Sequence, residues 1–320
     1  MNRLVLIDGN AVLHRAYHAI PPLTAPDGSV VNAVYGFATM LLRLHHDLAP
    51  THMAVAFDRP APTFRKKMYE GYQSKRPKME ENLVSQIPKV HDFVDAFGIP
   101  IFENDGFEAD DVIGTIAKAS RHAGIDQVII VTGDRDILQL VEGERVLGYL
   151  PTKGLSEAKL YREADVKDRL GVLPKHITDF KGLAGDASDN YPGVEGIGPK
   201  TAISLIDTFD SVEGVYSALH AHDLRLEKFS TSVLAKLTAG EAMAVLSKDL
   251  ATIRTNVPLS NDIAKSKITS LDTPLAREMI NTFHFHSLLK RFEGTVEIKK
   301  PVIVEATAGE AKKSEQQELF

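Results

Sequence analysis

The chain has 320 residues, of which 43% are hydrophobic and 25% are charged, and 37 basic against 43 acidic residues give a formal net charge of −6. This composition excludes a disordered or collagen-like chain, and the length favours two compact domains. The absence of cysteine excludes a disulfide framework, a cysteine-ligated zinc site and a thiol nucleophile. No apolar run reaches the roughly 18 residues of a membrane-spanning helix, and the first residues lack the pattern of a secretory signal, so we expect a cytoplasmic protein without a membrane partner.

The first half of the chain alternates short β-branched runs with longer amphipathic segments. We expect strands at 4–8, 52–58, 100–103, 127–132 and 145–150, and helices at 32–48, 80–97 and 108–123. This alternation is typical of βαβ units and of a Rossmann-like, mostly parallel α/β sheet. Active sites of such sheets lie beyond the carboxyl ends of the strands.

From about residue 174 the strand pattern stops. We expect helices at 174–183, 199–209, 212–219, 231–236, 241–252 and 273–285, which predict an all-helical second domain. Beyond residue 293 the sequence is rich in Ala, Glu, Lys and Gln and has little to bury. The expected domains are therefore 1–173 and 174–293, followed by a disordered tail at 294–320.

Nine carboxylates stand on five segments, near expected strand ends, at a helix start and in a glycine-containing turn: Asp8, Asp58, Glu108, Asp110, Asp111, Asp134, Asp136, Asp186 and Asp189. Taken singly, each has an ordinary explanation, because acidic residues favour the first helical turn and Asp is common in turns. Three strand ends on one sheet edge would bring several of them together, and two carboxylates about 6 Å apart repel by roughly 3 kcal/mol at an effective dielectric of about 20. Such a cluster requires cations or protons. Hard oxygen ligands predict Mg²⁺ or Mn²⁺, and two such ions suit phosphodiester hydrolysis.

The glycine-rich segment 192–202 joins two expected helices. It predicts a tight hairpin whose free backbone N–H groups lie at the start of a helix, which is an anion site to which Lys200 adds charge. An ordinary helix–helix turn is the alternative. The nearby Asp186 and Asp189 favour phosphate binding. The expected DNA-binding residues of the hairpin are Gly193, Gly196, Gly198, Lys200 and Thr201.

Segment 64–78 interleaves Lys and Arg residues with Phe64, Tyr69 and Tyr72. Cations with stacking rings suit single-stranded nucleic acid. A solvated surface helix is the alternative. The reversal of charge within an acidic chain favours nucleic-acid binding.

Together these motifs carry a resemblance to a known family. Residues 8–10, 57–58, 64–65, 108–111, 132–136, 185–190 and 193–202 stand in the order seen in the 5′–3′ exonuclease/flap endonuclease family, which the chain resembles over roughly residues 3–293. The resemblance implies a Rossmann-like (PIN-like) nuclease domain with a helical arch at about 60–82. It also implies that 174–293 is a helix-hairpin-helix domain that binds duplex DNA.

The resemblance further assigns roles to individual residues. Asp8, Asp58, Glu108, Asp110 and Asp111 would hold a first metal ion, and Asp134, Asp136, Asp186 and Asp189 a second. Tyr72 would stack on a base, Arg15, Arg65 and Arg76 would contact the scissile or neighbouring phosphates, and Lys66 and Lys75 would add to DNA binding. Many relatives have Lys after the tyrosine where this chain has Gln73, and Lys75 is the candidate that would compensate. A K⁺ ion on backbone carbonyls of the hairpin is also implied.

The implied function is metal-dependent hydrolysis of DNA by a monomer at 5′ ends, nicks, gaps and flaps during replication and repair. The alternative is a catalytically weak or inactive scaffold of the same fold that binds branched DNA, which Gln73 favours and the complete carboxylate set opposes. A haloacid-dehalogenase-type phosphatase is excluded because position 10 is Asn instead of Asp. Three questions stay open: exonuclease or endonuclease preference, DNA or RNA primer strands, and a free-standing enzyme or a fragment of a longer polymerase.

The last five residues, 316–320, are similar to the Gln-x-x-Leu-Phe peptides that dock on bacterial sliding clamps. Gln316, Leu319 and Phe320 would be the contacts, because a disordered peptide with two apolar anchors suits a groove on a partner. A chance match in a Glu/Gln/Lys-rich tail is the alternative. This end of the chain favours a free-standing enzyme.

Overall fold

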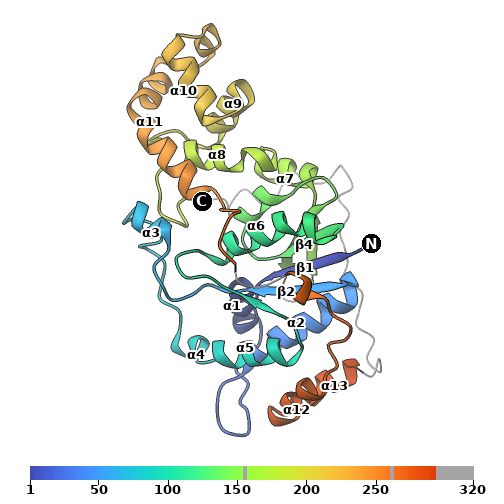
Figure 1. Ribbon diagram of the computed structural model, residues 1–320. Coiled ribbons are helices and arrows are strands. Elements are labelled where there is room, and N and C mark those ends of the chain that lie inside the picture. The colour runs from blue at the N-terminus through green and yellow to red at the C-terminus, as the bar shows by residue number, and fades with distance from the viewer. Residues whose placement is uncertain (154–156, 260–262, 293–320) are drawn as a thin grey trace. The chain divides into compact units, whose positions relative to one another are not determined.

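The computed structural model describes residues 1–153, 157–259 and 263–292 (Figure 1). They divide into two compact units. The sheet unit contains residues 1–61, 78–162 and the described part of 253–304, and the helical unit contains 62–77 and 163–252. The expected boundary at residue 173 differs from this division at three places: 62–77 and 163–173 belong to the helical unit, and the described part of 253–293 belongs to the sheet unit.

A six-stranded sheet forms the centre of the sheet unit. Its strands follow the order β3-β2-β1-β4-β5-β6, and every neighbouring pair is parallel except β5 and β6. The strands are β1 Arg3–Asp8, β2 His52–Ala56, β3 Ile101–Phe102, β4 Gln127–Val131, β5 Val146–Lys153 and β6 Glu157–Tyr161. The five expected strands and the mostly parallel α/β sheet are confirmed, and β6 was not predicted.

Helices cover both faces of this sheet, because the side chains of β1 alternate between two apolar cores. Val5 and Ile7 pack in the core with α2 and α5, whereas Leu4 and Leu6 pack against α6. Figure 1 shows α6 on one side of the strands and α2 and α5 on the other. The helices are α1 Gly9–Ala19, α2 Asn32–Leu48, α4 Glu81–Val84, α5 Ile87–Ala96 and α6 Ala109–Ala119, with 3₁₀ turns at Ser120–Ala123, Asp136–Leu140 and Ile263–Ser266.

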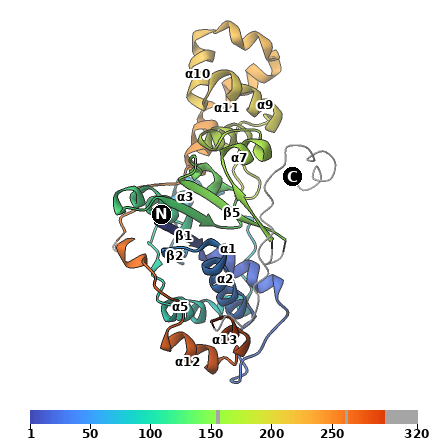
Figure 2. The same ribbon diagram turned by 90° about the vertical axis from the view of Figure 1, so that its right-hand side faces the viewer.

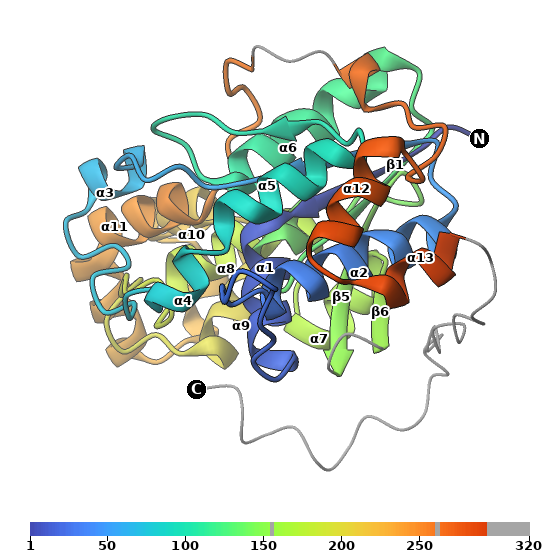
Figure 3. The same cartoon turned by 90° about the horizontal axis from the view of Figure 1, so that it is seen from below.

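The last two described helices, α12 Pro274–Thr282 and α13 His286–Phe292, also belong to the sheet unit. Figures 2 and 3 show α12 beside α5. Phe93 of α5 has its ring centroid 5.4 Å from that of Phe283 and 5.8 Å from that of Phe285. The expected helix at 273–285 is therefore shorter than predicted, and aromatic packing places it with the sheet instead of the helical domain.

The helical unit consists of α3 Phe64–Met68, α7 Glu163–Leu170, α8 Ile177–Ala184, α9 Pro199–Phe209, α10 Val212–Ala221 and α11 Thr231–Ala251, with 3₁₀ turns at Pro174–His176 and Leu224–Lys228. α11 is one helix where two were predicted. Gly240 lies inside this helix, at a position where a Cβ would be only 2.7 Å from Val194 Cγ1. This close packing explains why a glycine is found within the helix. Across the described part of the chain, none of the helices combines the length and the apolar character that crossing a membrane requires.

Candidate metal centre and DNA-binding elements

Carboxylates gather at the carboxyl edge of the sheet unit. Asp8 ends β1, Asp58 follows β2, and Asp134 follows β4. These three strands are neighbours in the order β2-β1-β4, so their ends meet at one edge. The start of α6 adds Glu108 and Asp110 to the same edge.

The Asp8 carboxylate is buried and is fixed by two hydrogen bonds. Its Oδ1 accepts the N–H of Ala11 at 3.0 Å, which caps α1, and its Oδ2 accepts the hydroxyl of Thr132 at 2.7 Å. Burial raises the pKa of Asp8 to about 7, although these hydrogen bonds oppose the shift, and the charges of Asp58 and Asp134 add to it. The Asp8 carboxylate therefore has a fixed position, but its surroundings disfavour the ionised form.

Asp110 lies in a similar electrostatic environment. Burial raises its pKa well above the ordinary value, and the charges of Asp134, Asp8, Asp136 and Glu108 raise it further. Buried carboxylates that repel one another are neutralised by protons or by a cation. Their oxygen-only donor set fits a hard divalent ion.

Asp58 is oriented by the backbone of Ala109 and the side chain of Asn10. Its Oδ1 accepts the N–H of Ala109 at 2.7 Å, and its own N–H donates to Asn10 Oδ1 at 2.9 Å. The Asp136 N–H donates to Asp134 Oδ1 at 2.8 Å. The turns that follow the strands thus set the carboxylate positions.

Asp111 was expected to be a metal ligand, but its carboxylate is bonded to backbone groups. Its fully buried carboxylate accepts the backbone N–H of Arg254 at 2.7 Å through Oδ1 and that of Glu108 at 3.1 Å through Oδ2. The second bond is part of a capping box at the start of α6. In the structure Asp111 therefore caps the helix and anchors the segment that contains Arg254.

The other predicted carboxylates, Asp186 and Asp189, lie in a tight turn of the helical unit. Gly185 and Gly193 have φ values of +74° and +63°, and a Cβ on Gly193 would lie 2.3 Å from Gly185 N. Only glycine fits this approach, which closes the turn as a bridge between Asp186 and Tyr191. The turn explains the glycine pattern of the sequence.

Asp186 is ionised by its surroundings. Burial opposes its ionisation, but the charge of Lys181 and hydrogen bonds from Lys181 and Ser188 outweigh that effect and lower the pKa. Lys181 is an isolated lysine on α8, so no local sequence pattern predicts its role.

The expected arch residues around Tyr72 contact this turn. Gln73 Nε2 donates to Asp189 Oδ1 at 3.0 Å, and the Tyr72 hydroxyl donates to Asp189 Oδ2 at 3.5 Å. The Tyr72 side chain is buried and stacks on Tyr191, with ring centroids 6.4 Å apart and planes 15° apart. This differs from the expectation that Tyr72 stacks on a base, because Tyr191 already covers its ring.

Arg65 is also buried, in contrast to its expected phosphate contact. Its Nε donates to the Leu250 carbonyl at 2.8 Å and its Nη2 to the Thr252 carbonyl at 3.0 Å, which ties α3 to the end of α11. Lys66, Lys75 and Arg76 are exposed, as DNA-binding residues must be, and Arg15 on α1 is half-buried.

The predicted hairpin forms at the start of α9. Val194 and Ile197 are buried and anchor it, while Gly196, Gly198 and Lys200 are exposed. Gly198 is the N-cap residue of α9, an 11-residue helix whose first position is proline. Thr201 is half-buried on the next position. The Gly196 carbonyl accepts a hydrogen bond from Lys236 Nζ at 3.1 Å, so an ammonium group already binds one carbonyl of the proposed K⁺ site.

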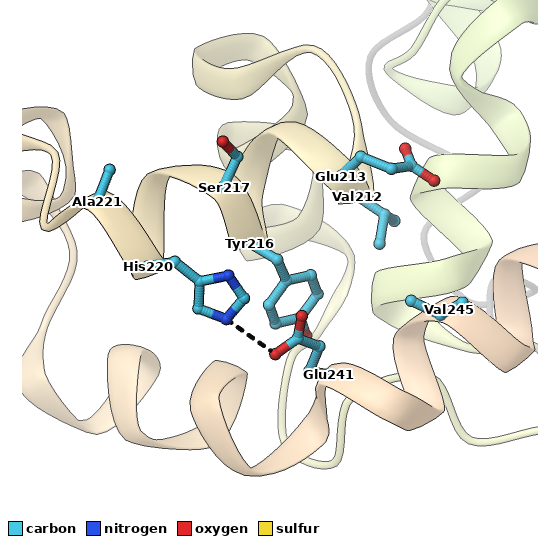
Figure 4. A pocket seen from close by; sticks show the side chains of 8 residues that line it. All are labelled: Val212, Glu213, Tyr216, Ser217, His220, Ala221, Glu241 and Val245. Carbon is cyan, nitrogen blue, oxygen red and sulfur yellow. Dashed lines mark hydrogen bonds and ion pairs between the residues drawn. The ribbon is translucent and has the colours of Figure 1, made fainter.

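An open cavity of about 620 Å³ lies between α10 and α11. Figure 4 shows Tyr216, His220 and Glu241 along it, with His220 Nε2 3.2 Å from Glu241 Oε2. None of the predicted metal or DNA-binding residues lines this cavity. The residues that line it therefore belong neither to the turn of Asp186 and Asp189 nor to the hairpin.

A mostly parallel sheet with clustered carboxylates at its carboxyl edge, followed in the chain by a helical unit with a glycine hairpin, is the arrangement expected of a metal-dependent nuclease. Residues 3–171 match the model of the 5′–3′ exonuclease N-terminal resolvase-like domain, and residues 172–274 match that of the 5′–3′ exonuclease C-terminal SAM fold. The chain belongs to the 5′–3′ exonuclease family.

Individual relatives agree with this assignment. The chain is 39% identical to a DNA polymerase I of Caldicellulosiruptor bescii over 90% of its own length and 33% of the relative, and 37% identical to that of Bacillus subtilis over 90% and 32%. It thus spans about a third of these curated relatives. A complex of bacteriophage T5 flap endonuclease with DNA and metal ions has the same fold, with a TM-score of 0.67 and 19% identity over 88% of this chain and all of that one.

The family match confirms the predicted fold class and the predicted class of enzyme, and it favours the nuclease over the scaffold alternative. The individual site residues stay predictions. The expected clamp-binding residues Gln316, Leu319 and Phe320 lie outside the described residues.

Proposed function

We propose that the chain hydrolyses DNA phosphodiester bonds at 5′ ends, nicks, gaps and flaps, and that the reaction requires Mg²⁺ or Mn²⁺. The observation that carries this proposal is the carboxylate cluster at the sheet edge, in which burial and neighbouring carboxylates raise the pKa values of Asp8 and Asp110. A divalent cation would stabilise these groups in their ionised forms. Family membership supports the 5′–3′ direction.

Asp8, Asp58, Glu108 and Asp110 are the proposed ligands of one ion, with Asp134 and Asp136 beside them on the sheet unit. The helical unit offers Asp186 and Asp189 as further ligands. When bound, two such ions lower the pKa of an attacking water and stabilise charge on the leaving oxygen. Ala11, Thr132 and Ala109 donate hydrogen bonds that orient the carboxylates in advance.

The exposed cations form the proposed DNA contacts. Lys66, Lys75 and Arg76 extend from the arch residues, and Lys200 lies at the start of α9, where free N–H groups favour a phosphate. Arg15 and Thr201 are further contacts, and a K⁺ ion at the hairpin is part of the proposal. The DNA in the bacteriophage T5 complex supports this role. Such phosphate contacts predict a strong dependence of affinity on salt.

We also infer a cellular role from the proposed chemistry. A nuclease that cuts 5′ flaps and nicks suits primer and Okazaki-fragment processing in replication and repair. We therefore propose a cytoplasmic monomer that acts on DNA directly, with the sliding clamp as a further partner through residues 316–320.

The test uses a 5′-labelled flap duplex, with Mg²⁺ or with EDTA. We expect Mg²⁺-dependent cleavage near the junction by the wild type, and at least about a 100-fold loss in Asp110→Asn. Asp92→Asn, which changes an exposed carboxylate on α5, is the matched control and should cleave normally. Tight flap binding without cleavage in either Mg²⁺ or Mn²⁺ would reject the enzyme and support the scaffold.

A further inference from the structure

Within the helical unit, the arch segment (residues 69–76) is held on the acidic turn (residues 186–191) by hydrogen bonds to its backbone. The Gln73 N–H donates to the Asp189 carbonyl at 2.8 Å. Asn190 Nδ2 donates to the Gly71 carbonyl at 2.7 Å. These bonds fix the two segments at the level of the main chain, so the side chains between them have defined positions.

Gln73 adds a side-chain contact to this arrangement. Its Nε2 lies 3.0 Å from Asp189 Oδ1 and 3.3 Å from the Tyr72 hydroxyl, and that hydroxyl lies 3.5 Å from Asp189 Oδ2. Tyr72 is itself fixed by burial and by its stack on Tyr191. The carboxylate of Asp189 therefore has a neutral donor near each oxygen.

The backbone of Gln73 supports the same interpretation. Its φ of +51° lies in the left-handed region, which a residue other than glycine adopts mainly where its surroundings hold it. The contacts to Asp189 supply such surroundings. The left-handed turn in return directs the Gln73 amide toward the acidic turn.

We propose that Gln73 is a positioning residue that fixes the Asp189 carboxylate for a divalent ion, an inference that rests on the proposed metal-dependent function. A neutral amide orients a carboxylate without cancelling its charge, so the carboxylate keeps its attraction for a cation. Hydrogen bonds of this kind to metal-binding carboxylates commonly determine metal affinity. In the same turn Asp186 has the ammonium of Lys181 as a partner.

The experiment measures Mn²⁺ binding to the full chain without DNA, by the loss of the free Mn²⁺ signal in electron paramagnetic resonance. Gln73→Asn keeps an amide and tolerates the left-handed backbone, but its side chain is one methylene too short to reach Asp189. Gln73→Met keeps the length and removes the donor. Ser74→Ala is the matched control, because it removes only the hydrogen bond from Asn190 to Ser74 Oγ. The difference in Mn²⁺ binding between the wild type and Asp189→Asn identifies the part of the binding that depends on Asp189.

We expect Gln73→Asn and Gln73→Met to weaken the Asp189-dependent Mn²⁺ binding about tenfold, and Ser74→Ala to leave it at the wild-type value. If both Gln73 variants bind Mn²⁺ like the wild type while Asp189→Asn weakens binding, the positioning role is overturned and the proposed function stands. Equal weakening in Ser74→Ala and the Gln73 variants would also overturn it, because general docking of the arch segment would then explain the effect. If Asp189→Asn leaves Mn²⁺ binding unchanged, the metal role of Asp189 in the proposed function fails together with the inference.

Discussion

Asp110 and Asp111 are adjacent in the chain, but their carboxylates lie in opposite electrostatic environments. Asp111 accepts backbone N–H groups from Glu108 and Arg254. Burial raises the pKa of Asp110, and the negative charges of Asp134 and other carboxylates raise it further. Asp111 therefore caps helix α6, whereas Asp110 is the residue that we propose as a metal ligand.

The first prediction separates these two roles. Asp111→Asn should lower the free energy of unfolding by about 1–3 kcal/mol, because asparagine keeps one acceptor oxygen and leaves one of the two buried backbone N–H groups facing an NH₂ group. Asp110→Asn should leave the stability of the metal-free protein unchanged or raise it, because it removes like-charge repulsion. Urea unfolding in EDTA measures both. Equal destabilisation by the two variants would contradict the assignment.

The second prediction concerns pH. The pKa of Asp8 rises from an ordinary value of 3.8, which applies to the unfolded chain, to about 7 in the folded protein. Between these pH values the folded state therefore binds more protons than the unfolded state. The contribution of Asp8 to stability is complete below pH 3.8 and is lost as the pH rises toward 7. Metal-free wild type should therefore lose stability over this range relative to Asp8→Asn, and Mg²⁺ should oppose the loss. Urea unfolding at several pH values measures the difference, and parallel pH curves for the two proteins would refute it.

The third prediction concerns Arg65, which is buried against the carbonyls of Leu250 and Thr252. Arg65→Ala should destabilise the protein by about 2–4 kcal/mol, because two carbonyls lose their partners and packing is lost. Hydrogen exchange should increase in residues 62–77. Lys66→Ala, at the exposed neighbour, should leave stability unchanged and reduce the salt slope of DNA binding by about 1. If Arg65→Ala behaves like Lys66→Ala in both measurements, Arg65 is a phosphate contact instead of an anchor.

The fourth prediction links α11 to the hairpin. Gly240→Ala places a Cβ about 2.7 Å from Val194, so it should destabilise the helical unit by about 1–3 kcal/mol despite the better helix propensity of Ala. Duplex affinity should fall as well, because Val194 anchors the hairpin. Adding Val194→Ala should restore part of the loss. A Gly240→Ala protein as stable as the wild type, measured by thermal unfolding, would show that the helix adjusts freely.

The sequence predicted the parallel sheet and the carboxylates at its edge. The alternation of strand and helix patterns, the strand ends and the acidic residues are all local features of the sequence. It did not predict the individual partners. Asp111 is bonded to Arg254, 143 residues away, and Arg65 to Leu250, 185 residues away. Motif spacing alone therefore could not distinguish a metal ligand from a cap, or a phosphate contact from a buried anchor.

Helix assignment shows the same limit. Two helices were expected at 231–236 and 241–252, whereas the structure has one long helix in which Gly240 packs closely on Val194. The sequence pattern of helix α12 predicted that it belongs to the helical domain. The packing of Phe93 on Phe283 and Phe285, which the sequence does not show, places it with the sheet unit. Burial of an apolar face depends on a partner that a linear pattern does not specify.

One experiment on the sheet-edge carboxylates separates DNA binding from DNA cleavage. Flap affinity is measured in Ca²⁺, and single-turnover cleavage of the same flap in Mg²⁺, for the wild type and Asp110→Asn. If the sheet-edge cluster holds the catalytic metal, the two proteins bind the flap with similar affinity, and Asp110→Asn cleaves at least about 100-fold more slowly. Equal cleavage rates, or a wild type that binds the flap and does not cleave it, would contradict the account.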